Sequence, residues 1–268
     1  MLISSVKNPR IGAVLALSKS RERKDSGCFA LEGAREIERA LNCAYVARTV
    51  FWCHSVLSVE AERILAGLES KVECTEVTEQ VFAKLAVRES SDGLVVVFEQ
   101  KRHDLTMLPQ RPMQLILAVQ GLEKPGNLGA ILRSADAAGA DALLLIDQAM
   151  DLYNPLVLRA SVGTAFSQTV VSLTSDELKK IAAERGWQIV AAALSGKSVA
   201  YTKVDFTRPS VILLGTEADG LSEDWLEESH QIAQIPMAGI ADSLNVSVAG
   251  AVMLFEARRQ ISQNSLTR

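Results

Sequence analysis

"IADSLNVSVAGAVMLFEARRQ", residues 240–260, places two polar residues around one apolar residue, directly before a run of small side chains typical of a helix. Ser243 and Asn245 are residues that begin helices well, because their side chains accept hydrogen bonds from the free N–H groups of a first turn. Taken by itself, this stretch favours a helix cap. The rest of the chain decides whether these side chains do more.

The composition is that of an ordinary globular protein. The chain has 268 residues, of which 48% are hydrophobic and 22% charged, and its net charge is −4. This length predicts roughly two domains. Because the chain is acidic, any surface for a nucleic acid must be local. One basic block fits phosphate contacts; it lies in residues 1–24, with Glu22 as the one acidic residue, and contains Lys7, Arg10, Lys19, Arg21, Arg23 and Lys24.

Cysteine and histidine usage excludes several kinds of site. The four cysteines lie in the first third without a C-x-x-C pair, and no signal-peptide pattern precedes them. This predicts reduced thiols in a cytoplasmic protein. The three histidines are scattered, which gives no support to a metal site or a Ser-His-Asp triad. No apolar run approaches the roughly 18 residues of a membrane span.

Helical and strand-like patterns alternate along the first hundred residues. We expect helices over residues 6–19, 34–42 and 59–68 and after Thr78, with strands at "CFALEG", "ARTVFWC" and "GLVVVFEQ". The polar stretch "KRHDLTMLPQRP" then reads as a linker. The sequence therefore predicts a domain of residues 1–103 and a second of residues 112–268.

The second domain is predicted to be an α/β fold. Its short apolar runs, "MQLILAVQ", "ADALLLID", "WQIVAAAL", "SVILLG" and "QIAQIP", are typical of parallel strands covered on both faces by helices. Ligands bind at the carboxyl ends of such strands. Three loops that follow strands are therefore the candidates for chemistry.

The first of these loops, "GLEKPGNLGAILRSADAAG", leads into a helix that Asn127 could cap, with Arg133 six residues on and Gly139 at the helix end. Together with Asp147 after the next strand, it permits a dinucleotide-binding interpretation. Its spacing is not G-x-G-x-x-G, however, and the charged loop is too long for a tight pyrophosphate turn. The second loop, "LLGTEADGL", places Glu217 between two glycines. The third is the stretch quoted first.

Together, "NLGAILRSADAAG", "LLGTEADGL" and "IPMAGIADSLNVSVAGAVMLFEARRQ" resemble the three motifs of the SpoU-type RNA ribose 2′-O-methyltransferases of the SPOUT superfamily. The resemblance covers residues 112–262. Residues 1–100 are more loosely similar to the L30e-like substrate-binding domain that precedes it in many members. The resemblance implies an α/β fold with a parallel-sheet SPOUT domain, a C-terminal trefoil knot, a smaller α/β L30e-like domain, and a homodimer.

The resemblance also implies S-adenosyl-L-methionine as the cofactor and assigns residues to its site. It places Leu214, Gly215, Ile235, Met237, Ser243 and Leu244 at the cofactor, and gives catalytic positions to Asn127, Arg133, Glu217, Ser243 and Asn245. It implies no metal. Because a guanidinium has a pKa above about 12, Arg133 suits a phosphate clamp better than a general base. Ser161, in "SVGTAFSQTVV", is expected to be structural.

The expected activity is 2′-O-methylation of a ribose in structured RNA, with 23S ribosomal RNA as the first choice of substrate. The alternatives are a tRNA ribose methyltransferase, a noncatalytic RNA-binding protein, and a nicotinamide-linked oxidoreductase built on the glycine turn at residues 121–129.

Overall fold

The computed structural model describes residues 2–86, 91–147, 150–216 and 220–266. The chain divides into two compact units, Met1–Lys101 with Asp151–Ser167, and Arg102–Met150 with Gln168–Arg268. The segment Asp151–Ser167 is thus part of the first unit, although in sequence it lies between two strands of the second.

The first unit is built on a mixed sheet of five strands in the order β1-β4-β3-β5-β2. The strands are β1 (Leu2–Ile3), β4 (Glu73–Val77), β3 (Ala47–Trp52), β5 (Leu94–Glu99) and β2 (Cys28–Glu32). β5 runs antiparallel to both of its neighbours, and the other pairs are parallel. β-Branched and aromatic residues are frequent in β3 (ARTVFW) and β5 (LVVVFE), and such side chains pack well on a pleated surface.

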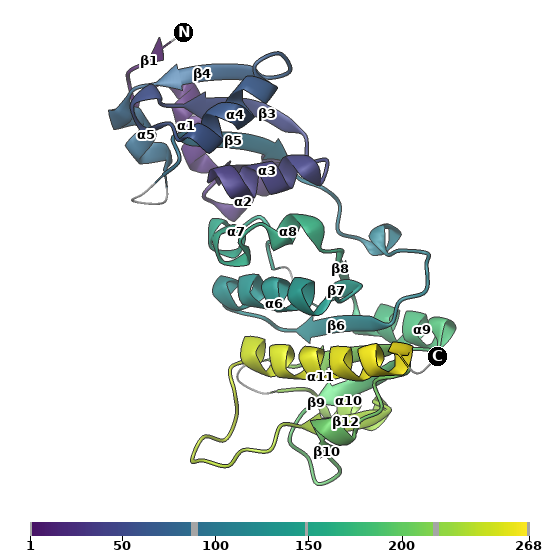
Figure 1. Ribbon diagram of the computed structural model, residues 1–268. Coiled ribbons are helices and arrows are strands. Elements are labelled where there is room, and N and C mark those ends of the chain that lie inside the picture. Colours follow the sequence, from purple (N-terminus) through teal and green to yellow (C-terminus); the bar gives the residue numbers. More distant parts are fainter. Residues whose placement is uncertain (1, 87–90, 148–149, 217–219, 267–268) are drawn as a thin grey trace. The chain divides into compact units, whose positions relative to one another are not determined.

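Helices surround this sheet (Figure 1). They are α1 (Pro9–Ala16), α2 (Ser20–Ser26), α3 (Ala34–Asn42), α4 (Val59–Leu68), α5 (Glu79–Leu85), α7 (Pro155–Ser161) and α8 (Thr164–Ser167), with a short 3₁₀ turn at η1 (His54–Val56). Apolar residues of α1 and α5 form one core with β3 and β5. The predicted helices at 34–42 and 59–68 are confirmed with the expected bounds.

Arg23, a member of the predicted basic block, is buried and cannot contact RNA. Its Nε and Nη2 atoms donate to Asp151 Oδ2 at 2.9 and 2.5 Å, and its Nη1 donates to the backbone oxygen of Leu17. The Arg23 side chain is 2% exposed. The prediction of a phosphate contact at this position is therefore wrong: the charge pattern could not reveal an acidic partner so distant in sequence.

The second unit contains a sheet of seven strands, all parallel, in the order β10-β12-β9-β11-β6-β7-β8. The strands are β10 (Val199–Ala200), β12 (Gln231–Gln234), β9 (Gln188–Ala192), β11 (Ser210–Leu214), β6 (Leu115–Gln120), β7 (Ala142–Ile146) and β8 (Val170–Leu173). The predicted parallel α/β fold is confirmed. The trefoil knot stays a prediction.

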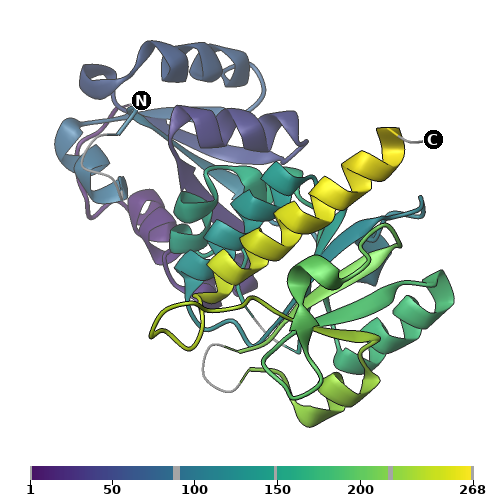
Figure 2. The same ribbon diagram turned by 60° about the horizontal axis from the view of Figure 1, so that its bottom comes forward.

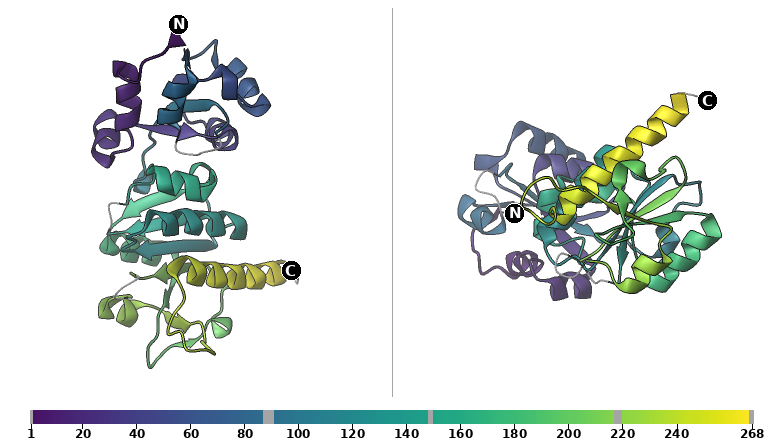
Figure 3. Two further views of the ribbon diagram at one scale, coloured as in Figure 1. Left: turned by 90° about the vertical axis from the view of Figure 1, so that its left-hand side faces the viewer. Right: turned by 90° about the horizontal axis from the view of Figure 1, so that it is seen from below.

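Helices cover both faces of this sheet, as predicted. α6 (Pro125–Ala138) and α11 (Val246–Leu266) pack against each other; α11 also contacts β6 and β11, and α6 contacts β7. Figure 2 shows the two helices crossing one face of the sheet, with α11 in yellow. α9 (Ser175–Arg185) and α10 (Glu223–Glu228) contribute to the core on the opposite face, where residues such as Leu178 and Trp225 meet Ile116 and Leu213. Figure 3 gives two further views of this layering, and η2 (Leu105–Met107) and η3 (Tyr201–Lys203) complete the unit.

Two predicted helix bounds are wrong, for local reasons. The expected helix at 6–19 begins only at Pro9, because Asn8 caps it through a 2.9 Å bond from the Arg10 amide, and it ends at Ala16. α6 begins at Pro125, with Lys124 at its N-cap, so Asn127 lies inside the first turn and does not cap it. Within the described ranges, no helix is long and apolar enough to cross a membrane.

Candidate active site

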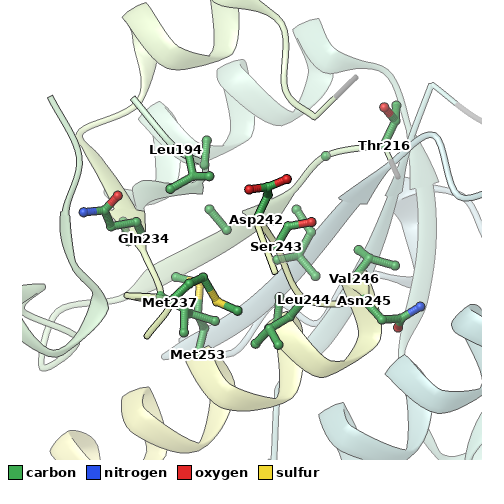
Figure 4. A pocket seen from close by; sticks show the side chains of 17 residues that line it. Leu194, Thr216, Gln234, Met237, Asp242, Ser243, Leu244, Asn245, Val246 and Met253 are labelled. Carbon is green, nitrogen blue, oxygen red and sulfur yellow. The ribbon is translucent and has the colours of Figure 1, made fainter. Parts of the chain in front are cut away.

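A cavity of about 370 Å³ opens at the carboxyl ends of β9, β11 and β12 (Figure 4). Its size lies in the range of small-molecule sites, and its place is where open parallel sheets bind ligands. It is lined by Ala192, Ala193, Leu194, Leu214, Gly215, Thr216, Ala233, Gln234, Ile235, Met237, Asp242, Ser243, Leu244, Asn245, Val246, Ala249 and Met253.

Gly215 shapes the loop that follows β11. A Cβ atom at this position would overlap the carbonyl group of Gly220 and lie 2.6 Å from the Leu221 nitrogen, so only glycine fits. The Thr216 amide donates to the Gly220 oxygen at 2.9 Å, which closes the loop, and Gly220 has a φ of +71°. The cavity wall at the end of β11 therefore depends on two glycines.

The loop after β6 packs on the loop after β11. Gly121 has a φ of +63°, and a Cβ atom there would overlap Cγ2 of Thr216. The first and second candidate loops therefore touch where their strands end, and the positive φ and this close contact explain the glycine at position 121.

The first and third motifs meet through two side chains. Nδ2 of Asn245 donates to Oδ1 of Asn127 at 3.3 Å. Asn245 also caps α11, because its Oδ1 accepts from the Ser247 amide at 2.9 Å and from the Ser247 hydroxyl at 2.6 Å. Thus Asn245 both caps the helix and contacts a residue of the first motif. The two roles considered for this stretch, a helix cap and a part of the site, are compatible.

A second contact joins α6 and α11 at the far end of α6. Nε of Arg258 donates to the Ala138 oxygen at 2.6 Å, and its Nη2 to the Gly139 oxygen at 2.5 Å. These carbonyls lack partners within their own helix, so a cation there is favourable. The two helices that carry Asn127 and Asn245 are therefore held in register at two points.

The six residues predicted to contact a cofactor all line the cavity: Leu214, Gly215, Ile235, Met237, Ser243 and Leu244. Sequence reasoning missed other lining residues, among them Thr216, Gln234 and Asp242. Thr216 and Gln234 lie at or just after a strand end, a signal that could have found them. Asp242 precedes the predicted Ser243 and had no separate signal.

Of the predicted catalytic residues that the structure describes, Asn127 and Arg133 do not line the cavity. Arg133 lies on α6, exposed, six residues after Asn127; at 100° per residue, the two side chains leave the helix about 120° apart. Arg133 does not line the cavity. Glu217 lies outside the described residues.

Asp147 and Ser161 have structural partners. The Asp147 carboxylate, at the end of β7, accepts from the Ser175 amide at 3.0 Å and from Gln120 Nε2 at 3.3 Å. It thus binds the start of α9, which argues against the ribose-binding role of the dinucleotide interpretation. The buried Ser161 hydroxyl donates to the Leu158 oxygen at 2.9 Å. Among the described residues, no three His, Cys, Asp or Glu side chains gather as metal ligands.

Known proteins share both parts of the sequence. Residues 114–255 match the SpoU rRNA Methylase family, and residues 8–96 match the MRM3-like substrate binding domain. The chain is 33% identical to an uncharacterized tRNA/rRNA methyltransferase of Synechocystis sp., over 96% of this chain and 93% of that one.

Two characterised or solved relatives extend the likeness. A 23S rRNA (uridine(2479)-2′-O)-methyltransferase of Streptomyces viridochromogenes is 32% identical, over 91% of this chain and 87% of that one. The crystal structure of an AdoMet-bound rRNA methyltransferase from Sinorhizobium meliloti superposes with a TM-score of 0.88, at 30% identity, over 97% of this chain and 98% of that one. With three motif loops joined around one cavity, the chain belongs to the SpoU rRNA methylase family.

Proposed function

We propose that the protein methylates a ribose 2′-hydroxyl of structured RNA, with 23S ribosomal RNA as the substrate and S-adenosyl-L-methionine as the methyl donor. The observation that carries this proposal is the convergence of three motif loops, which adjoin through Gly121 and Thr216 and through Asn127 and Asn245 beside one cavity. The Streptomyces relative, which acts on 23S rRNA, matches both units of the chain.

The cavity residues fit S-adenosylmethionine. Apolar side chains, including Leu214, Ile235 and Met237, suit the adenine ring. Within the described residues, the backbone groups of residues 237–244 make no hydrogen bond to another backbone group, so they are available to a polar ligand. Bound there, the cofactor supplies an electrophilic methyl group on a sulfonium.

The polar side chains beside the cavity would align the attacking hydroxyl. Asn127 and Asn245 hold each other's orientation, and Ser243 lines the cavity two residues before Asn245. Such positioning is worth several kcal/mol to a bimolecular transfer. We assign Arg133, exposed on α6, to binding an RNA phosphate and stabilising developing negative charge. Glu217 and Ser243 are assigned to orienting or relaying the proton of the hydroxyl.

We assign substrate recognition to residues 1–103. Basic side chains of the N-terminal block that stay exposed are available to RNA phosphates: Lys7, Lys19, Arg21 and Lys24. Double-stranded or folded RNA is gripped largely by shape and phosphate contacts, which a separate module of this kind provides.

We further propose that the enzyme acts as a cytoplasmic homodimer. On α11, Val248 and Phe255 are 47% and 51% exposed, although they follow the apolar pattern of the helix. These two exposed apolar side chains are seven residues, about two helical turns, apart and so lie on the same side of α11, which favours a partner surface there. Sedimentation equilibrium would give twice the monomer mass if this holds, and the monomer mass if it does not.

Titration calorimetry with S-adenosylhomocysteine and with NAD separates the proposal from the oxidoreductase alternative. We expect heat of binding for the first ligand and none for the second. Binding of NAD alone would overturn the proposal.

Transfer of labelled methyl groups to purified RNA then tests the activity and the substrate. We expect incorporation into 23S rRNA from cells that lack the gene, and mapping of 2′-O-methyl groups locates the nucleotide. Incorporation into tRNA alone would favour the tRNA alternative. Cofactor binding without transfer to either RNA would leave a noncatalytic RNA-binding protein.

A further inference from the structure

Asp242 is the one ionisable side chain that lines the cavity within the described part of the chain. The other described lining side chains are apolar, amide or hydroxyl groups. The described part of the cavity wall therefore carries the charge of Asp242 and no compensating positive charge. A ligand with net positive charge is the natural occupant of such a wall.

The methyl donor and its product differ in charge at one atom. S-adenosylmethionine carries a sulfonium in addition to its zwitterionic amino acid group, whereas S-adenosylhomocysteine carries a neutral thioether at the same place. An anion near that atom attracts the donor and gains nothing from the product. An anion near the amino acid group would attract both equally.

The position of Asp242 in the loop indicates that its carboxylate lies near the sulfonium of the bound cofactor, not near the amino acid group. It directly precedes Ser243 in the loop that also holds Asn245, whose amide is bonded to Asn127. Figure 4 shows the Asp242 carboxylate beside Ser243, within the cavity wall. Because the transferred methyl group is attached to the sulfonium, that atom must lie next to the residues that align the RNA hydroxyl.

We propose that Asp242 makes the site select the methyl donor over the demethylated product, by placing its carboxylate near the sulfonium of the bound cofactor. This inference rests on the proposed function. Asp242 is a specificity residue here, and its attraction disappears when the methyl group leaves, which favours product release.

The size of the effect follows from the exposure of Asp242. The side chain is exposed, so water and salt weaken its field. Removal of the charge should therefore reduce the affinity for S-adenosylmethionine about threefold to tenfold. In turnover assays the loss should fall on the KM of the donor more than on kcat, because the sulfonium charge is already fading in the transition state.

The test is calorimetric titration of the full-length protein with S-adenosylmethionine and S-adenosylhomocysteine, in the absence of RNA. The variants are Asp242→Asn, which removes the charge, and Asp242→Glu, which keeps it. Glu227→Gln is the matched control, because Glu227 is exposed on α10 and does not line the cavity. Each titration is repeated at about 50 mM and about 500 mM salt, across which the screening length falls severalfold.

We expect Asp242→Asn to weaken donor binding alone, and Asp242→Glu and Glu227→Gln to retain the donor-to-product ratio of the native protein. Added salt should reduce that ratio in the native protein and leave Asp242→Asn unchanged. Equal weakening of both ligands, or weakening of neither, would overturn the proposal. Failure of the native protein to bind either ligand would instead overturn the proposed function.

Discussion

The side-chain amide of Asn245 donates a hydrogen bond to Oδ1 of Asn127, 3.3 Å away, and so links the start of α11 to the first turn of α6. The same Asn245 side chain caps α11 through Ser247. One residue therefore serves stability and site geometry at once. These two roles can be separated by substitution.

Replacing Asn245 with serine should preserve the cap and remove the amide donor. Serine caps helices about as well as asparagine, so the free energy of unfolding should stay within about 0.5 kcal/mol of the native value. Methyl transfer should fall about 10-fold to 100-fold, because small misplacement of reacting groups costs rates of that order. Chemical denaturation and single-turnover kinetics measure the two effects.

Asn245→Ala provides the comparison, since it should lose the cap as well, about 1 kcal/mol. Combined with Asn127→Ala, Asn245→Ser completes a double-mutant cycle on activity. If the two residues act through their bond, the double variant should be hardly worse than either single one. Fully additive losses would show that the bond has no part in catalysis.

Substitution of Gly215 with alanine should impair cofactor binding. The new Cβ atom would lie 2.6 Å from the Leu221 nitrogen and overlap backbone atoms of Gly220, which cannot move as a flexible side chain can. We expect a loss of about 1–3 kcal/mol in unfolding free energy and a raised Kd for S-adenosylhomocysteine. Gly196→Ala is the control, because nothing lies within 4 Å of its Cβ position and Gly196 does not line the cavity; it should change neither quantity appreciably.

The Arg23–Asp151 pair should contribute strongly to stability. The two side chains are 2% and 16% exposed, so Arg23→Met leaves a nearly buried carboxylate without its cation. Such a change costs about 3–5 kcal/mol. The exposed pair of Arg21 and Asp25, 3.5 Å apart, supplies the control: Arg21→Met should unfold close to the native midpoint. Equal midpoints for the two variants would contradict this account.

Asp141 should make the protein sensitive to acid. Burial opposes ionisation of its carboxyl, but bonds from the Leu115 amide, from Arg111 and from the Gln114 amide outweigh burial, and the pKa of Asp141 lies below its ordinary value. A carboxyl whose pKa is lowered by folding stabilises the native state above its unfolded pKa of about 3.9. That contribution is lost as the pH falls from about 4 through the folded pKa.

Asp141→Asn should therefore lower the unfolding free energy at pH 7 and flatten its decline below about pH 4. Denaturant titrations at a series of pH values measure both slopes. If the unfolding free energy of Asp141→Asn falls below about pH 4 as steeply as that of the native protein, other carboxylates cause the fall.

Local patterns were sufficient for much of the fold. The apolar periodicity placed α3 and α4 with their observed bounds, and continuous apolar runs predicted β6, β7, β9, β11 and β12. The same reasoning missed β4, whose polar residues Glu73 and Glu76 disguise a strand paired with β3. Strand pairing depends on neighbours distant in sequence, which local patterns do not contain.

The sequence predicted those site residues that belong to the three motifs, but it did not single out other residues of the cavity. The resemblance led to Asn127 and Asn245, and the structure explains their contact. It did not lead to Asp242, because a loop carboxylate in a sequence is ordinarily solvated. For Arg23 the error was the opposite one. As a cation in a basic run it was expected at the surface, but it is buried against Asp151, which lies 128 residues away in the sequence.

The segment Asp151–Ser167 follows β7 and precedes β8 in sequence, yet it belongs to the first compact unit, where Tyr153 and Phe166 stack on Phe29. Dividing the polypeptide at any one position therefore cannot give two fragments that each contain a complete unit. A truncated protein that starts after Lys101 would carry these aromatic rings without their partner and expose them to water. The two units therefore share one stretch of backbone, and neither can be exchanged for another domain without rebuilding that stretch.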